Sequence, residues 1–523
     1  MISRSIIFWL ALFFLYATTA LLSAYTGLFG SWTQSSFGVA RYYNWDPDAF
    51  YLASGIEFFD SRYPTFIGHP GLPLQFIIGT LSHGLYKVWP GQYDSSYFDF
   101  VAEHQYALIL SARLAIAACH FVSVVVLYKI SRIFLSAGQS QVAISIYATT
   151  AISLTYITKI SPEPLLVAFV MLAYWFSIRS AVSIEIKHGV IYSALTAFFT
   201  VLALLSKLMI AAALPFYFLI VITISNTIDR RCKTIVLMAY TVFTIVLFRL
   251  LSEKVNWGEY FSYWAGYSPL PPSHSASGIS QVANIFQVGA SFVSLAAGLV
   301  IQHLDLVNVF NIRTWQGQFN IAELPLVLLG LGGMVRYWDN YPEKRLVLKQ
   351  LFILLLLLTP VVVLKNASHY RVIHLAFFSI FSAYMLFASA RYLEKFLIKK
   401  GWGRAFKIQL IAGVLGLNIF GVALAVEAKI QDFHAYSAGW KQIYDCLRII
   451  NAGERISLED GGASGIRPDR LLDYYLSDPR YKVSMLRHYE PETIVLSKDN
   501  KSDQGNSGKT HCVAEISGLK FLK

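Results

Sequence analysis

Long apolar runs recur along the chain, and they constrain its fold more than any other feature. A membrane core about 30 Å thick is crossed by roughly 20 helical residues. Runs of about that length lie at 5–27, 106–128, 140–158, 163–179, 189–205, 208–225, 233–251, 321–336, 346–364, 370–390 and 406–426. With 55% hydrophobic and 14% charged residues, the chain lies outside the range of soluble globular proteins. The sequence predicts a polytopic all-α membrane protein with about eleven transmembrane helices.

The first run, 5–27, has two possible readings. Arg4 precedes it and Ser23 and Ala24 follow it, which is also the pattern of a cleaved secretory signal. Its apolar core is longer than that of a signal, so a retained helix is favoured.

Lysine and arginine residues predict the orientation, because they gather in short cytosolic loops. With the N-terminus inside, the cytosolic segments hold 18 of them, and the longer outer segments before residue 427 hold only nine. The chain is therefore expected to be N-in and C-out, most plausibly in a bacterial inner membrane. The apolar stretch 281–301 is read as a re-entrant or surface helix, because a further span would place the basic segment 336–349 outside.

Charge and motifs disfavour several function classes. The net charge of +12 suggests nucleic-acid binding, but the tail from residue 427 holds 14 basic and 14 acidic residues. The excess therefore belongs to the membrane part, where cytosolic loops explain it, and no nucleic-acid partner is expected. The chain also has no Walker loop, no GxGxxG after a strand, no HExxH and no GxSxG, which disfavours a nucleotide-driven enzyme or a protease.

The predicted membrane domain, 1–426, has two long outer loops, 28–105 and 252–320. The first is rich in aromatic residues and is expected to be folded. Apolar residues at helical spacing predict one amphipathic helix over 51–59, and a second helical stretch, 72–89, is expected on the membrane surface. The second loop contains "YFSYWAGYSPLPPSHSASG", whose Pro, Ser and Gly residues indicate irregular backbone.

The tail, 427–523, differs from the rest in composition. "GWKQIYDCLRII" is typical of an amphipathic helix, and "RISLED", "ETIVLS" and "HCVAEISGL" are typical of short strands. About 95 residues suffice for a small α/β outer domain. Cys446 and Cys512 both fall in it, and they are either bridged or packed as free thiols.

Two carboxylates open the first predicted loop helix, in "YYNWDPDAFYLASGIEFF" at 42–59. Asp46 and Asp48 are one residue apart, so one can act as a general base while the other orients a partner or a cation. The alternative is structural, with Asp48 capping the helix and Asp46 in solvent. Spacing alone does not decide between these roles.

The segment "DPDAFYLA", followed by "GHPGLPLQFIIG", resembles the first outer loop of the GT-C membrane glycosyltransferases, and most of all the protein O-mannosyltransferase and aminoarabinose transferase group. The matching residues are Asp46, Asp48, Tyr51, His69, Pro70 and Gly71. Weaker matches follow in "SPEPLL" at 161–166, "LSKLM" at 205–209 and "HYRVIHLAFF" at 369–378. Many relatives have adjacent Asp-Glu where this chain has Asp-Pro-Asp, so which carboxylate is the base stays open.

The resemblance implies transfer of a hexose or pentose from a polyprenyl-phosphate donor to a lipid, glycan or protein acceptor at the outer membrane face. Asp48, with Asp46, would activate the acceptor, and displacement in one step would invert the anomeric carbon. The expected ligands of the donor phosphate are Lys207, Arg371, Arg113 and His369. The expected substrate-binding residues are His69, Glu163, Tyr51 and Tyr370.

Each of these residues also has a simpler reading. A basic residue at an outer span end runs against the usual charge bias, but it can also snorkel to the interface. Glu163 can be an ordinary loop acid and His69 an ordinary loop histidine. A divalent cation, Mg²⁺ or Mn²⁺, could bind Asp46 and Asp48, although two carboxylates fall well short of the six or more ligands that such ions take.

Two other functions remain open from the sequence. A transporter or flippase would use the carboxylates and arginines along a substrate path, and would carry acidic or broken helices near the bilayer midplane, often in repeated halves. The polar residues instead gather at one predicted face. A polysaccharide polymerase or ligase of the same compartment is harder to separate from a transferase.

The predicted topology can be tested by cysteine labelling with a membrane-impermeant reagent. Probes at positions 46 and 260 are expected to react from outside, and probes at 132 and 345 only after permeabilisation, because the basic loops face the cytosol. Reaction at 345 in intact cells would show instead that 281–301 crosses the membrane and that the chain after it is inverted.

Overall fold

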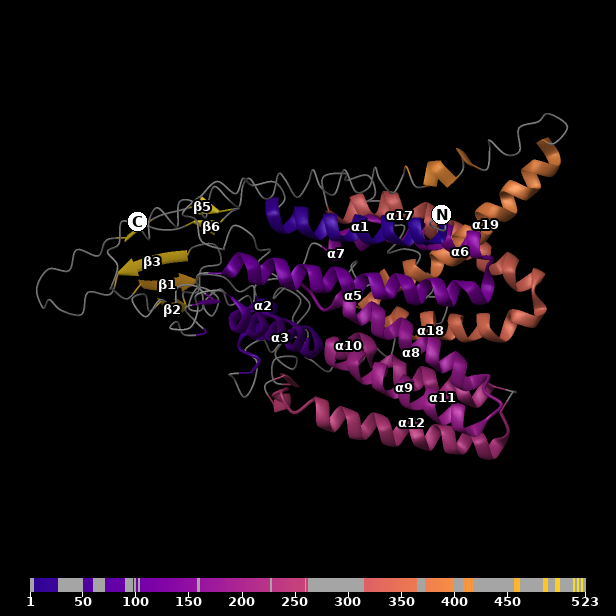
Figure 1. Ribbon diagram of the computed structural model, residues 1–523, viewed down its shortest axis with the longest axis horizontal. Helices are drawn as coiled ribbons and strands as arrows, with labels where there is room; N and C mark the ends of the chain where they lie inside the picture. Colours follow the sequence, from indigo (N-terminus) through magenta and orange to yellow (C-terminus); the bar gives the residue numbers. More distant parts are fainter. Residues whose placement is uncertain are drawn as a thin grey trace, which may run out of the picture.

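The computed structural model describes 4–26, 50–59, 71–89, 97, 100–101, 104–157, 160–225, 228–258, 260–261, 315–364, 372–397, 408–409, 411–414, 416, 456–460, 483–487, 494–498, 511–512, 515–516 and 519–520. Long helices lie side by side, and the strands lie at one end of the helical bundle (Figure 1). The stretch 281–301, expected to be a re-entrant or surface helix, and the segment 427–455, which contains Cys446, lie outside the described residues.

The bundle is built from neighbouring helices that pack in series. Helix α1 packs on α5, α5 on α8, α8 on α9 and α9 on α12, while α19 packs on α17 and α6. The bounds are α1 Arg4–Thr26, α5 Gln105–Phe134, α6 Ala137–Ala148, α7 Ala151–Ile157, α8 Glu163–Ala181, α9 Ile186–Ser206, α10 Leu208–Ala211, α11 Ala213–Ile224, α12 Arg230–Leu251, α17 Trp315–Asn340, η4 Pro342–Lys344, α18 Arg345–Leu364 and α19 Val372–Leu397.

Several of these helices have the length and composition of membrane spans. Within the described residues, five qualify, and they are Ala107–Phe134, Glu163–Ala181, Ile186–Ser206, Arg230–Leu251 and Val372–Tyr392. The protein is therefore an integral, multi-pass membrane protein, whereas the total of eleven spans stays a prediction.

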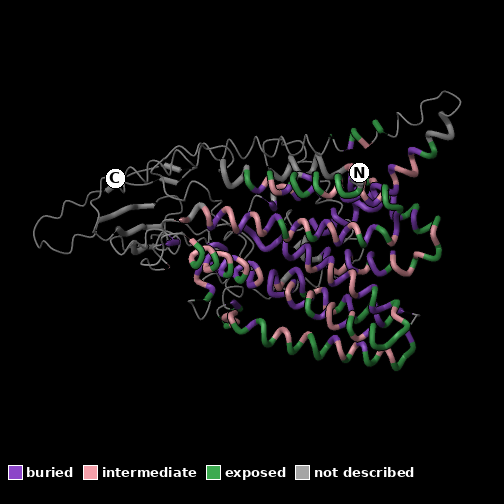
Figure 2. The backbone as a smooth tube through the Cα atoms, viewed as in Figure 1, coloured by how far each residue is buried: buried purple, intermediate pink, exposed green. Residues whose placement is uncertain are grey.

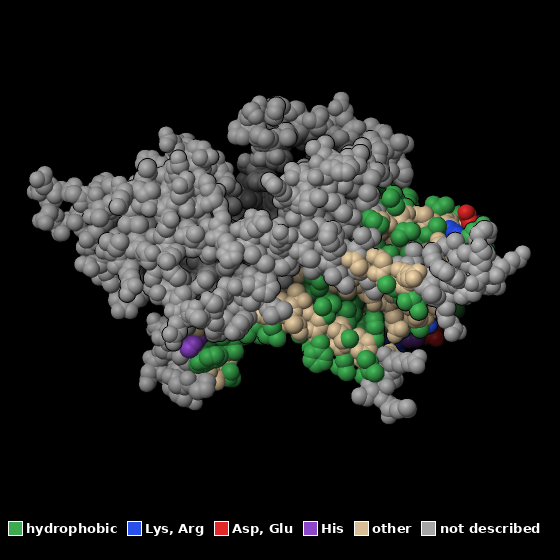
Figure 3. Space-filling model, turned by 90° about the horizontal axis from the view of Figure 1, so that it is seen from above, with side chains coloured by type: hydrophobic (Ala, Val, Ile, Leu, Met, Phe, Trp, Pro, Cys, Tyr) green, Lys and Arg blue, Asp and Glu red, His purple; other side chains and the backbone are tan. Residues whose placement is uncertain are grey.

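The surface has the distribution expected of a bilayer protein. The central helices are buried, while α12 buries only Val236 and Tyr240 and exposes apolar side chains such as Met238 and Ile245 (Figure 2). On the face seen in Figure 3, the described side chains are mainly hydrophobic or uncharged, and charged ones gather at one end. An apolar belt with charges beyond it fits a lipid environment.

Two predicted spans are divided in the structure: 208–225, between α10 and α11 at Ala212, and 140–158. The run 140–158 was expected to be a single helix, but α6 ends at Ala148 and α7 begins at Ala151. The hydroxyl of Thr149 donates to Ser145 O and that of Thr150 to Tyr147 O, while the Ser153 N–H donates to Thr150 Oγ1. These side chains compete with the helical backbone for its hydrogen bonds, which is the physical reason for the break.

The two helices expected in the first outer loop are confirmed. Helix α2 covers Phe50–Ile56 and α3 covers Leu72–Val88. They pack on each other, and α3 also contacts α5 and α9. The described part of this loop is therefore folded against the membrane domain.

Short strands form in the tail, three of them within the segments predicted from sequence. β1 (Ile456–Asp460) pairs in parallel with β2 (Val483–Arg487) and antiparallel with β3 (Ile494–Lys498), which pairs antiparallel with β4 (His511–Cys512). A second, two-stranded sheet joins β5 (Glu515–Ile516) to β6 (Leu519–Lys520). β2 was not predicted, and the α/β domain as a whole stays a prediction.

Glycines allow α17 and α19 to approach closely. A Cβ on Gly330 would lie 2.8 Å from the Cβ of Phe378, and a Cβ on Gly333 would collide with the carbonyl oxygen of Phe381. Close backbone approach at small residues is a common way for helices to associate in a bilayer. The neighbouring Gly332 is different, because a Cβ there would meet nothing within 4 Å.

This contrast gives a matched pair of variants. Gly333→Ala is expected to lower the thermal unfolding temperature of the detergent-purified protein, because the backbone of α19 would have to move. Gly332→Ala is expected to keep or raise it, since alanine favours a helix by about 1 kcal/mol over glycine. Equal stability of the two variants would contradict the packing described here.

Candidate functional site

A buried ion pair joins the start of α8 to the end of α9. The Lys207 ammonium donates to Glu163 Oε1, and both side chains are 6% exposed. Glu163 is the first residue of α8, and Lys207 immediately follows α9. A helix carries partial positive charge at its N-terminus and partial negative charge at its C-terminus, so each charge sits at the helix end that favours it.

Lys207 lies where the backbone changes from one helix to the next. Its φ and ψ of −151° and 93° are extended, and α10 begins at Leu208. Its N–H donates to Ala203 O at 3.0 Å, and its carbonyl accepts from the N–H of Ile210 at 3.2 Å. The helix end therefore fixes the backbone of the lysine at the level of Glu163. This placement excludes the snorkelling alternative for Lys207 and the solvent-exposed loop alternative for Glu163.

The first outer loop is attached to this helix end by its backbone. The Gly71 N–H donates to Ser206 O at 3.2 Å, next to Lys207. Gly71 has φ of 55°, and a Cβ there would collide with the ring of Tyr51, which is fully buried. Only glycine fits both the left-handed backbone and the covering tyrosine. The structure thus brings together Tyr51, Gly71, Lys207 and Glu163, which the sequence analysis had placed in one site.

Arg113 is buried in the same part of the bundle. It lies on α5 and is 4% exposed, and its neighbour Ala112 belongs to the apolar cluster that contains Tyr51 and Leu165. The role of Arg113 as a ligand of the donor phosphate stays a prediction.

The sequence analysis missed Gln75, which lies one turn into α3. Its backbone N–H donates to Gly71 O at 3.0 Å, and its side chain is 1% exposed. Neither amide atom of that side chain has a hydrogen-bond partner among the described residues. The one signal available in the sequence was a single polar residue inside the apolar run "LPLQFII".

A second basic residue secures the first outer loop. The Lys254 ammonium donates to Phe58 O at 3.2 Å and lies 5.6 Å from the centre of the Phe58 ring. Lys254 follows α12, so this contact joins the start of the second outer loop to the segment just after α2. The loop that carries Tyr51 is therefore anchored at two points.

Six expected site residues lie outside the described part of the chain, and they are Asp46, Asp48, His69, His369, Tyr370 and Arg371. Asp48 comes two residues before α2 and Arg371 directly before α19. Among the described residues, no group of three or more His, Cys, Asp or Glu side chains could hold a metal ion. The metal proposal for Asp46 and Asp48 is therefore untested.

The buried Glu163–Lys207 pair is suited to bind an anionic group. A lysine held at a helix end by a carboxylate can bind an anionic oxygen without reorienting its own backbone. Interactions of such a charge are strongest where water is excluded. The site is suited to stabilise a phosphate that gains charge as a bond to it breaks.

Comparison with known proteins shows what this chain is similar to. Residues 105–252 match the family model described as dolichyl-phosphate-mannose-protein mannosyltransferase. The apo crystal structure of ArnT from Cupriavidus metallidurans aligns with a TM-score of 0.52 and 14% identity, covering 90% of this chain and 84% of that chain. Part of the chain is therefore similar to this family of membrane glycosyltransferases, and its fold is like that of ArnT. The resemblance stated from the sequence is thus confirmed.

Two other solved structures are similar at a lower level. ArnT from the same organism bound to undecaprenyl phosphate aligns with 15% identity and a TM-score of 0.48, covering 90% of this chain and 85% of that chain. AglB from Archaeoglobus fulgidus, an oligosaccharyltransferase in complex with an inhibitory peptide and a dolichol-phosphate, aligns with 12% identity and a TM-score of 0.45. That alignment covers 80% of this chain and 56% of the other. No curated protein matches the sequence.

The segment that matches the family model contains Arg113, Glu163 and Lys207. Because Glu163 and Lys207 are buried, the replacement Lys207→Met is expected to leave a carboxylate without its counter-charge. We expect this to cost about 3–5 kcal/mol of unfolding free energy. The double variant Glu163→Gln with Lys207→Met is expected to recover most of that loss.

Thermal unfolding in detergent measures this, and Lys187→Met is the matched control because Lys187 is exposed on α9. If Lys207→Met were as stable as Lys187→Met, the pair would not hold the helix ends together.

Proposed function

We propose that the protein transfers a sugar from a polyprenyl-phosphate donor to a lipid, glycan or protein acceptor at the extracytoplasmic face of the membrane. The observation that carries this proposal is the buried Glu163–Lys207 pair, bound through Ser206 and Gly71 to the outer loop that bears the two carboxylates. The matching family is named for a dolichyl-phosphate sugar donor, which supports a donor of this class.

The reaction assigns a role to each charged residue. Asp48, oriented by Asp46, takes the proton of an acceptor hydroxyl or amine as its oxygen or nitrogen attacks the anomeric carbon. The bond from that carbon to the phosphate oxygen breaks, and the polyprenyl phosphate leaves with the electron pair. Attack opposite the leaving group in one step inverts the anomeric carbon.

Lys207 is proposed to bind the leaving phosphate, with Arg113, Arg371 and His369 as further ligands. Glu163 keeps the Lys207 ammonium in place before the donor arrives, and its carboxylate can also accept a hydrogen bond from the acceptor. Tyr51, His69 and Tyr370 are proposed to contact the sugar or the acceptor. A divalent cation on Asp46 and Asp48 is not required by this scheme.

The compartment and the domain roles belong to the same proposal. The charge bias of the loops supports an inside N-terminus, so the site would face outward from a bacterial inner membrane. Residues 1–426 would form the catalytic membrane domain and 427–523 an outer domain. Figure 1 supports this division, because β1, β2 and β3 lie at the same end of the bundle as α2 and α3.

The test is transfer of radiolabelled sugar from defined polyprenyl-phosphate donors by the purified protein. Asp48→Asn is expected to reduce turnover by about a hundredfold or more, which is the range for loss of a general base. Thermal stability is expected to stay near wild type, because the substitution is isosteric. Asp94→Asn, in the same outer loop, is the matched control and is expected to keep full activity.

If Asp48→Asn kept more than about a tenth of wild-type turnover, its loss would be below about 1.4 kcal/mol of barrier and the base assignment would be wrong. Uphill movement of a labelled lipid or solute by the protein, without transfer to any acceptor, would favour the transporter alternative.

A further inference from the structure

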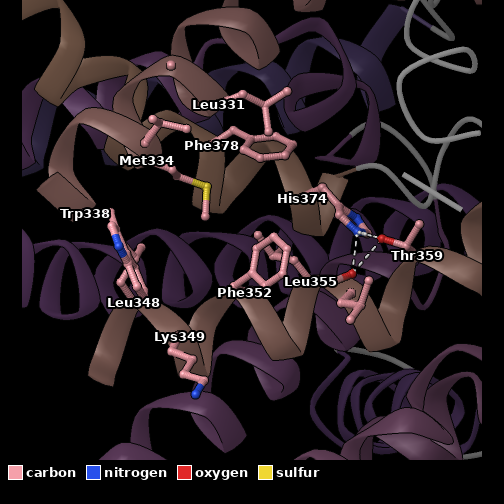
Figure 4. Close-up of a pocket in the computed structure, with 13 residues that line it drawn as sticks. Leu331, Met334, Trp338, Leu348, Lys349, Phe352, Leu355, Thr359, His374 and Phe378 are labelled. Atoms are coloured by element: carbon pink, nitrogen blue, oxygen red, sulfur yellow. Dashed lines mark hydrogen bonds between the residues drawn. The ribbon is translucent and has the colours of Figure 1, made fainter. Parts of the chain in front are cut away.

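A groove of about 700 Å³ lies between α17, α18 and α19, on helices other than those of the Glu163–Lys207 pair. This volume is in the usual range for small-molecule sites, about 300–1,000 Å³. Trp338, Leu348 and Lys349 lie at one end, and His374 and Thr359 at the other (Figure 4). Almost all of the wall between these ends is aliphatic or aromatic.

The groove opens sideways, toward the surroundings of the bundle. Val335 and Phe352 line it and are 67% and 49% exposed, while its floor of Phe378 and Leu355 is buried. Both exposed residues lie on helices that the sequence predicts to span the membrane. A molecule in this groove would therefore be reached from the lipid rather than from water.

The polar end at His374 is closed by the protein itself. The His374 Nε2 atom lies 3.2 Å from Leu355 O and 3.4 Å from Thr359 Oγ1, and both side chains are buried. Ten residues separate Lys349 from Thr359 on α18, which is about 15 Å at the helical rise. That is about half of a hydrocarbon core. The groove thus has the depth of one leaflet.

The other end of the groove is cationic. Lys349 lines it, and the Arg345 guanidinium lies 5.5 Å from the centre of the Trp338 ring, with its Nε–H donating to Trp338 O at 3.0 Å. Asp339 and Glu343 are close in sequence, and Arg336 and Lys344 balance their charge, so Arg345 and Lys349 are the excess. Tryptophan and basic residues together are typical of the level of lipid headgroups.

We propose that this groove binds an acyl chain of an anionic phospholipid, with the headgroup phosphate held by Lys349 and Arg345. The cationic end fits a phosphate, the apolar wall fits one chain, and the depth fits one leaflet. The connection from α17 to α18 lies at the opposite end of the bundle from α2 and α3 (Figure 1). A lipid anchored there is separate from a donor whose phosphate binds Lys207.

Gly332 provides a variant that fills the groove without disturbing the helix packing. It lines the groove, and a Cβ there would meet no atom within 4 Å. Gly332→Phe is therefore expected to fold and to occupy the space of the acyl chain. Gly138→Phe is the matched control, because a Cβ on Gly138 also meets nothing within 4 Å and Gly138 lies on α6, outside the groove.

Native mass spectrometry of the full-length protein in detergent measures binding of phosphatidylglycerol and of phosphatidylcholine. Wild type and Gly138→Phe are expected to retain one phosphatidylglycerol, and Gly332→Phe to lose at least about nine-tenths of it. Lys349→Gln and Arg345→Gln are each expected to weaken phosphatidylglycerol binding about fivefold, in line with the contribution of one cation near an anionic headgroup. Binding of phosphatidylcholine should not change, and Lys187→Gln should change neither.

Three outcomes would overturn the proposal. Gly332→Phe could retain as much lipid as Gly138→Phe, or the two charge variants could bind phosphatidylglycerol as wild type does. Alternatively, polyprenyl phosphate could displace phosphatidylglycerol from wild type and fail to bind Gly332→Phe, which would assign the groove to the donor lipid. None of these results depends on whether the protein transfers a sugar.

Discussion

The ion pair between Glu163 and Lys207 is the interaction on which the candidate site depends. Two charges inside an apolar bundle destabilise the folded state unless they are paired. Removing one partner of such a pair lowers the unfolding free energy by more than the pair itself contributes. Here the start of α8 and the end of α9 add their own dipoles to the pairing. Fixing these two helix ends also fixes Ser206, whose carbonyl accepts the Gly71 N–H. The geometry of the outer loop thus follows from the pair beneath it.

The bilayer explains why function gathers at the helix ends. Within hydrocarbon, backbone groups have to be satisfied inside the helices, so irregular backbone and charged groups are confined to the ends or to protein-lined sites. The charges of the Glu163–Lys207 pair lie at helix ends at one end of the bundle. The charges at the proposed lipid groove, Arg345 and Lys349, lie at the other end. The apolar helices between them would separate the two proposed sites, which differ in their proposed partners.

Much of the fold could be predicted from residue order, because a membrane span is a local property of about 20 residues. Helices α8, α9, α12 and α18 begin and end within a few residues of the predicted limits. Two predicted spans are instead broken, between α6 and α7 and between α10 and α11. The hydroxyls of Thr149 and Thr150 donate hydrogen bonds to nearby carbonyl oxygens. The mean hydropathy of a long segment does not register such bonds. The loop helices α2 and α3 were predictable for the same local reason, since their apolar residues recur at helical spacing.

Tyr51, Glu163 and Lys207 were singled out from the sequence, but their contacts were not predicted. The sequence by itself determined that the chain spans a membrane, which residues are charged in apolar surroundings, and which segments, such as "GHPG" and "LSKLM", resemble a known family. Only the tertiary structure decided that Lys207 pairs with Glu163, that Tyr51 covers Gly71, and that α17, α18 and α19 enclose a groove. Those contacts join residues far apart in the chain, such as 163 and 207 or 71 and 206. They depend on which helix faces pack together, and a local pattern of hydrophobicity does not specify that.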